Sequence, residues 1–99
     1  MTGIEPIKGN VPEKFTLTQN YPNPFNPTTA ISFDLPKAGF VSLKVYDMLG
    51  REVATLVNGP VNPGLHETTL ESSGLPSGIY FYRLEVGSLV EVRKLVVLR

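Results

Sequence analysis

The sequence predicts an all-β domain built as an antiparallel sandwich. Short runs of residues alternate between apolar and polar side chains with a period of two, as in strands that bury one face. Turn signals containing Gly, Pro, Asn or Asp separate these runs at intervals of about 8 to 12 residues. No run has a convincing helical period. These observations predict about seven short strands, the number typical of an immunoglobulin-like β-sandwich.

The first strands are separated by a rigid loop. Residues 15–18 alternate as a short edge strand, and residues 28–35 alternate as a half-buried strand with Ile31, Phe33 and Leu35 on one face. Between them, residues 19–27 contain three prolines, which fix their own φ and favour extended backbone before them. We expect the two aromatic residues of this loop to cap the end of the core. They are Tyr21 and Phe25.

The middle of the chain predicts a hairpin. Residues 41–46 alternate as a third strand, and residues 47–50 offer an Asx-forming side chain, Asp47, and a conformationally free Gly50 for a tight reversal. Residues 51–57 continue as a fourth strand. The Asn-Gly-Pro sequence at residues 58–60 then predicts that this strand ends in a turn.

The last part of the chain contains the most strongly β-prone runs. Residues 65–71 form a polar and therefore weaker fifth strand candidate. Residues 79–86 and 89–98 are separated by two residues beginning with Gly87, which is the spacing of a two-residue hairpin. Alternate residues of the final run share one face, with a lysine interrupting an apolar row: Val90, Val92, Lys94, Val96 and Leu98.

One domain with a leading linker accounts for the 99 residues. Residues 1–13 are rich in proline and glycine and poor in large apolar groups, which favours a solvated linker. Residues 14–99 then form the domain, with a small barrel as the alternative to the sandwich. No signal peptide is recognisable at the start. We therefore expect residues 1–3 to be an artificial start and the natural polypeptide to extend upstream.

Composition argues against several classes of function. Nine basic and nine acidic residues give zero formal net charge, so no nucleic acid partner is expected. Cysteine is absent, the acidic residues are scattered, and the glycines lie one to a turn, so we expect no metal and no cofactor. The single histidine, His66, lies in a strand candidate, and we expect no catalytic residues.

Four motifs in order resemble the type A C-terminal sorting domain of the bacterial type IX (Por) secretion system. They are YPNPFNPTT at residues 21–29, VYDMLGREV at 45–53, LPSGIYFYRL at 75–84 and RKLVVLR at 93–99. The resemblance covers residues 15–99. It implies an immunoglobulin-like sandwich, related to a domain of flagellar hook-capping proteins, although residues 65–70 are more polar than that family suggests.

The resemblance also implies a route and partners. An upstream cargo, covalently linked to the domain, would pass through the periplasm and cross the outer membrane to the cell surface or medium. The type IX translocon would recognise the domain, and a sortase-like peptidase would remove it. The family motifs map onto scaffold residues and onto a terminal sorting signal. The scaffold residues are Asn23, Pro24, Asp47, Gly50, Gly78 and Tyr80, and the signal residues are Arg93, Lys94, Leu95, Val96, Val97, Leu98 and Arg99.

Two other functions fit the same pattern. A purely structural immunoglobulin-like module would have the same strands, and four aromatic residues could form a sugar-binding platform: Tyr46, Tyr80, Phe81 and Tyr82. Strand alternation requires two of the four to face inward. If the final strand lies at a sheet edge, its backbone could also pair with a translocon segment or support weak self-association.

Overall fold

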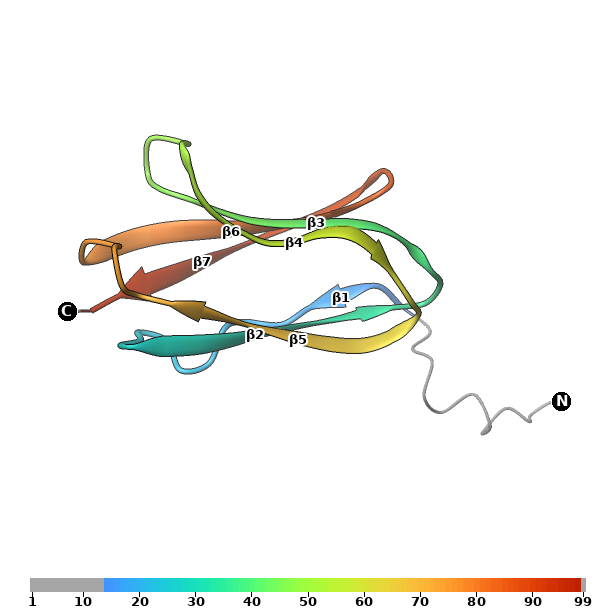
Figure 1. The fold of residues 1–99 in the computed structure, drawn as a ribbon, viewed down its shortest axis with the longest axis horizontal. Helices are drawn as coiled ribbons and strands as arrows, with labels where there is room; N and C mark the ends of the chain where they lie inside the picture. Colours follow the sequence, from blue (N-terminus) through green and yellow to red (C-terminus); the bar gives the residue numbers. More distant parts are fainter. Residues whose placement is uncertain (1–13, 99) are drawn as a thin grey trace, which may run out of the picture.

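The computed structural model describes residues 14–98 as a two-layered β-sandwich (Figure 1). The predicted linker, residues 1–13, and Arg99 lie outside the described residues. Seven strands confirm the predicted fold class: β1 (Thr16–Leu17), β2 (Thr28–Leu35), β3 (Gly39–Tyr46), β4 (Glu52–Val61), β5 (Gly64–Glu71), β6 (Gly78–Val86) and β7 (Leu89–Val97). Across residues 14–98 we find no helix able to span a membrane.

The strand order is that of an immunoglobulin-like sandwich. One sheet has the order β1-β2-β5 and the other the order β4-β3-β6-β7, with all neighbours antiparallel. These sheets correspond to strands ABE and C′CFG of that architecture. The predicted hairpin between the last two strands is confirmed, because Val86 pairs with Leu89 across Gly87, whose φ is +61°.

The core lies between the sheets and follows the period of two. The predicted half-buried β2 is confirmed, with Ile31, Phe33 and Leu35 facing inward, and β3, β6 and β7 complete the core from the other sheet. The residues at its centre are Ile31, Phe33, Leu35, Val41, Leu43, Val45, Tyr82, Leu84, Leu95 and Val97, each no more than 1% exposed. Of the four aromatic residues considered for sugar binding, Tyr80 and Tyr82 are buried, so they form no exposed platform.

The predicted end of the fourth strand is wrong. β4 continues through the expected turn, and Asn58, Gly59 and Pro60 pair with residues of β3. A proline is tolerated there because β4 is an edge strand, where the missing N–H would have faced away from the ladder. Two register shifts between β3 and β4 accommodate the extra length, and the reversal falls at residues 62–63 instead.

The polar fifth strand is a full member of the sheet. β5 pairs with β2 over eight residue pairs, and apart from the exposed Leu65 its outer face is polar, because that side of the sheet meets solvent. On the inner face Leu70 is buried, and the His66 ring stacks on Phe33 with centroids 5.5 Å apart. His66 Nε2 also lies 2.7 Å from the carbonyl oxygen of Asn62. These contacts give His66 a structural role.

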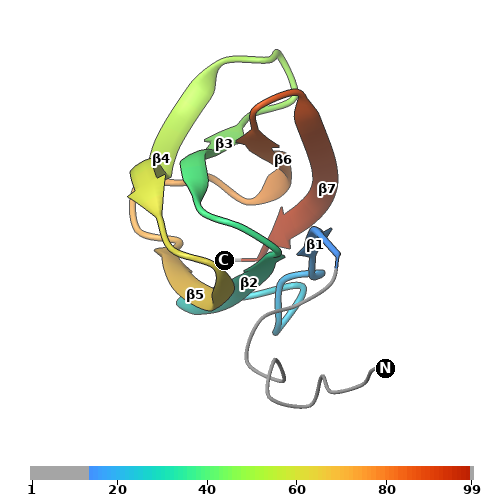
Figure 2. The same ribbon diagram turned by 90° about the vertical axis from the view of Figure 1, so that its right-hand side faces the viewer.

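Tyr82 ties the two sheets together on the side where β1 approaches β7 (Figure 2). Its ring is fully buried on the inner face of β6, and its hydroxyl donates to the carbonyl oxygen of Thr18 at 2.7 Å. Burial raises the pKa of this hydroxyl above its ordinary value, because the phenolate would be poorly solvated. Arg93 Nε reinforces the same junction by donating to the Leu17 carbonyl at 3.2 Å.

We expect Tyr82→Phe to lower the free energy of unfolding by about 1–2 kcal/mol, because the partly buried Thr18 carbonyl loses its donor. Urea denaturation would measure the loss. Tyr46→Phe is the matched control, since Tyr46 is only half-buried and no hydrogen bond of its hydroxyl occurs within residues 14–98. Equal losses in both variants would contradict the assigned role of the Tyr82 hydroxyl.

Candidate functional site

All four sequence motifs meet at one end of the sandwich, which we call the motif end. The chain reverses direction between consecutive strands from β2 to β7. As a result, β2, β4 and β6 begin at this end, and β3, β5 and β7 finish there (Figure 1). The motif end comprises the loop at residues 19–27, the β3–β4 turn at 47–51, the β5–β6 loop at 72–77 and the last residues of β7. The described chain begins at the opposite end, at Lys14.

The proline-rich loop folds around a buried pair of polar residues. Asn20 Nδ2 donates to Thr29 Oγ1 at 2.9 Å and to the Pro22 carbonyl at 3.0 Å, and Thr29 Oγ1 donates to the same carbonyl at 2.7 Å. Asn20 and Thr29 are each only 2% exposed. The peptide bonds that precede the loop prolines are cis: Tyr21-Pro22, Asn23-Pro24 and Asn26-Pro27.

This loop covers the outer edge of the final strand. The Phe25 N–H donates to the Val96 carbonyl and the Leu98 N–H donates to the Phe25 carbonyl, both at 3.1 Å. Asn23 Oδ1 accepts from the Val96 N–H at 3.0 Å, and Phe25 forms a parallel bridge with Val97. The loop therefore acts as a short additional strand beside β7. We call these contacts, with the bond from Gln19 described next, the clamp.

Gln19 extends the clamp by one residue pair. Its Nε2 donates to the Lys94 carbonyl at 2.8 Å.

The prediction for the two aromatic residues of the loop was half right. Phe25 is buried at 2% exposure and seals the core, whereas Tyr21 is 81% exposed. Tyr21 points away because its backbone pairs with Ala30 of β2, which leaves its ring on the solvent side.

Asp47 organises the β3–β4 turn. Its Oδ1 accepts from the backbone N–H groups of Leu49 and Arg51, each at 2.9 Å, and its Oδ2 accepts from Arg51 Nε at 2.8 Å. The Arg51 backbone N–H is the main cause that lowers the pKa of this carboxyl below its ordinary value. Gly50 completes the turn with a φ of +83°. The turn is rigid and presents Met48 and Leu49 to solvent.

Tyr80 organises the neighbouring loop as a tyrosine corner. Its ring is buried at the start of β6, and its hydroxyl donates to the carbonyl of Pro76, four residues upstream, at 2.7 Å. This is the contact that recurs at the corresponding corner of immunoglobulin-like domains. Gly78 begins β6 with a φ of +150°, a backbone conformation that favours glycine.

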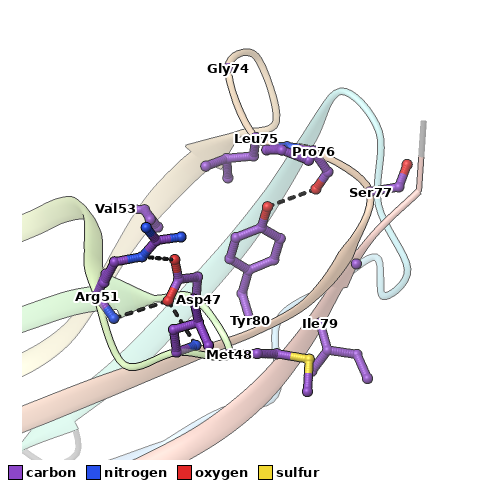
Figure 3. A pocket seen from close by; sticks show the side chains of 12 residues that line it. Asp47, Met48, Arg51, Val53, Gly74, Leu75, Pro76, Ser77, Ile79 and Tyr80 are labelled. Atoms are coloured by element: carbon purple, nitrogen blue, oxygen red, sulfur yellow. Dashed lines mark hydrogen bonds and ion pairs between the residues drawn. The ribbon is translucent and has the colours of Figure 1, made fainter.

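A groove of about 570 Å³ separates this loop from the β3–β4 turn. Figure 3 shows that three of its polar side chains are already engaged, with Asp47 bonded to Arg51 and the Tyr80 hydroxyl bonded to the Pro76 carbonyl. The rest of the lining is largely apolar, including Met48 and Ile79. Within residues 14–98 no group of three or more His, Cys, Asp or Glu side chains could hold a metal ion. The groove offers shape and apolar contact.

Residues assigned to the terminal signal fall into two groups. Leu95 and Val97 are in the core, at 0% and 1% exposure, so the folded domain cannot present their side chains to a receptor. By strand alternation Lys94, Val96 and Leu98 point outward, and Leu98 is 59% exposed. Arg93 is exposed but lies on the side that faces β1, where it bonds to Leu17.

Several residues of the motif end were missed by sequence reasoning. Gln19, Asn20 and Thr29 had no assigned role, yet they fix the loop or extend the clamp. A polar residue beside a proline-rich segment is the only local signal, and it is weak. Gln19 and Lys94 are 75 residues apart, so no local pattern could pair them.

We expect Gly50→Ala to lower the free energy of unfolding by about 1–2 kcal/mol, because a side chain is strained at its positive φ. No atom lies within 4 Å of the added methyl group, so strain is the only cost. Gly59→Ala is the matched control, since its site is equally open and its φ is not positive, and we expect a change within about 0.5 kcal/mol. Thermal or urea unfolding would measure both, and equal losses would exclude strain at Gly50.

Loss of the Asn23 side chain should loosen the clamp. We expect Asn23→Ala to accelerate amide hydrogen exchange at Val96 by about fivefold, which corresponds to the loss of one hydrogen bond worth about 1 kcal/mol. Asn26→Ala is the control, because Asn26 lies in the same loop but bonds to Ser72. Equal acceleration in both variants would show that Val96 responds to the loop as a whole and not to the Asn23 bond.

Comparison with known proteins agrees with the geometry of the motif end. A family model described as "Secretion system C-terminal sorting domain" matches residues 19–98, which include the clamp and both organised turns. The search of curated proteins found no match. Domains of this family are generally non-catalytic, are handled by the type IX machinery and accompany proteins exported across the outer membrane. The chain belongs to the family of secretion system C-terminal sorting domains and is a sorting signal for type IX secretion.

Proposed function

We propose that the type IX translocon recognises the folded domain at the motif end, through outward side chains at the end of β7. The observation that carries the proposal is that the backbone at the end of β7 is hydrogen-bonded to the clamp, while the outward side chains there face solvent. The clamp engages the Val96 and Leu98 backbone, but the Leu98 side chain remains 59% exposed. A receptor that reads a preorganised surface loses little conformational entropy on binding.

Lys94 is the cation best placed for recognition. Its neighbours on the same sheet are paired, Lys44 with Glu52 at 3.5 Å and Arg83 with Glu85 at 2.5 Å. Across residues 14–98 Lys94 forms no ion pair. An exposed unpaired ammonium adds little to stability and can be read by an acidic partner. Arg99, the other cation of the terminal motif, is assigned to the signal from the sequence alone.

Burial reduces the seven predicted signal residues to those that a receptor could contact directly. Leu95 and Val97 would act indirectly, by seating β7 in the core. Arg93 would act through the sheet junction, where it bonds to Leu17. Lys94, Val96 and Leu98 remain for direct contact.

We also propose that the cargo is linked upstream of Lys14, at the end of the domain opposite the motif end. The long axis of the domain is 51 Å, so a cargo at one end leaves the motif end open. Cleavage by a sortase-like peptidase would fall within residues 1–13, whose proline and glycine content favours an accessible linker. The cargo would then pass from the periplasm to the cell surface or medium.

Export of a reporter tests the recognition surface. Residues 4–99 would be fused behind a signal peptide and a reporter in a bacterium with a type IX system. We expect Lys94→Gln/Arg99→Gln to weaken receptor binding about 5- to 30-fold, from two cation contacts of about 0.5–1 kcal/mol each, and to retain the reporter in the periplasm.

The control neutralises two cations at the other end of the domain, Lys14→Gln/Lys37→Gln, and should be exported normally. Both double variants must unfold at the same temperature as the unchanged domain. Normal export of Lys94→Gln/Arg99→Gln would contradict recognition through these cations. Equal retention of both double variants would indicate that net charge matters and not the motif end.

A further inference from the structure

The outer edge of β7 is divided into two halves. Its second half, from the Lys94 carbonyl to Leu98, is covered by the clamp. β7 pairs with β6 without a register shift, and in an antiparallel ladder alternate residues turn their N–H and C=O groups to opposite sides. Since Val96 faces the clamp, Val90 and Val92 must face the same outer side.

The first half of this edge has no partner within residues 14–98. No hydrogen bond on the outer side is found there for the backbone of Val90 or Val92. Figure 2 shows β7 at the edge of its sheet, beside β1 of the other sheet, whose Leu17 carbonyl accepts from the Arg93 side chain and not from the β7 backbone. The open ladder therefore covers about five residues, from Val90 to the N–H of Lys94.

Apolar side chains surround the open ladder. Leu89, Val90 and Val92 are 48%, 46% and 53% exposed. Proteins normally blunt such an edge, because it can pair with another strand.

The other sheet edges of the described domain are blunted. β4 carries Pro60 and two register shifts, and β1 has only two residues. β5 has Glu67 and Glu71 on its exposed face. The beginning of β7 has no proline and no register shift, and its charges Glu91 and Arg93 pair with each other at 3.8 Å. Its outward side chains Val90 and Val92 are apolar, which singles it out as a binding edge.

We propose that the open half of β7 docks an extended partner segment by β-strand addition, with alternate apolar residues and one carboxylate opposite Lys94. In the antiparallel register, two apolar side chains of the partner lie opposite Val90 and Val92, and its acidic residue meets the unpaired ammonium. The inference rests on the proposed function in one respect, since the partner would belong to the export machinery.

Charge favours an acidic strand over a second copy of this chain. A two-fold pairing of two β7 strands centred on Val92 places Lys94 opposite Val90 of the other copy. Centred on Glu91, it sets two carboxylates against each other, which is unfavourable. Either register leaves Lys94 without an acidic partner.

The test is a titration of the 99-residue chain with the peptide acetyl-Glu-Thr-Val-Thr-Val-amide, followed by amide NMR. We expect shifts and slowed exchange at the N–H groups of Val90, Val92 and Lys94. The control peptide begins with Lys in place of Glu, and should bind about two- to fivefold more weakly, the effect of one exposed charge pair.

A proline at the edge tests the backbone contact. Val92→Pro removes an N–H that faces the partner and not β6, so it should spare the fold and weaken peptide binding at least about fivefold. Val92→Thr is the matched control, because it changes the same side chain but keeps the N–H and β propensity, and it should bind more tightly than Val92→Pro. Unchanged unfolding temperatures would show that the variants are folded.

Several results would overturn the inference. One is that no amide signal shifts at millimolar peptide. Another is that the Glu peptide binds Val92→Pro and Val92→Thr equally, and a third is that the Glu and Lys peptides bind the unchanged domain equally. Dimerisation of the chain that Val92→Pro abolishes, without peptide binding, would replace the partner strand by a second copy. Reporter export separates the two proposals: export lost in Lys94→Gln/Arg99→Gln but normal in Val92→Pro would retain the recognition surface and reject strand docking as its means.

Discussion

The clamp between the loop at residues 19–27 and the end of β7 is the constraint on which the motif end depends. It joins the loop that follows β1 to the last strand through residues 71 to 75 positions apart. The clamp saturates the backbone of the final residues and places Phe25 in the core. A C-terminal strand at a sheet edge would otherwise fray, because its last residues are paired on one side only. The sorting signal is thereby a defined surface.

The polar groups of the motif end serve its architecture. Asp47 is committed to the backbone and side chain of Arg51, and Tyr80 to Pro76, so each reversal is rigid. With its hydrogen-bonding capacity used internally, the groove between them presents mainly apolar surface. An end built in this way suits recognition by shape and by a few exposed charges.

Alternation along β7 divides one sequence motif between two tasks. Leu95 and Val97 hold the strand against the core, and the outward residues between and beyond them face solvent. A substitution within the motif can therefore impair export in two ways. It lowers stability where the side chain faces the core, and it removes a receptor contact where the side chain faces solvent. This is why export assays need variants matched in unfolding temperature.

The all-β class, the apolar face of β2 and the final hairpin could be predicted from the amino-acid sequence, because each follows from local periodicity or from a turn of two residues. The sequence motifs also identified the family. Tertiary structure alone decided where β4 ends, since Pro60 is tolerated only at a sheet edge, and edges exist only once strand order is set. It likewise decided that Phe25 is buried and Tyr21 is not, and that the clamp covers half of β7, because these depend on pairings between distant segments that no local pattern records.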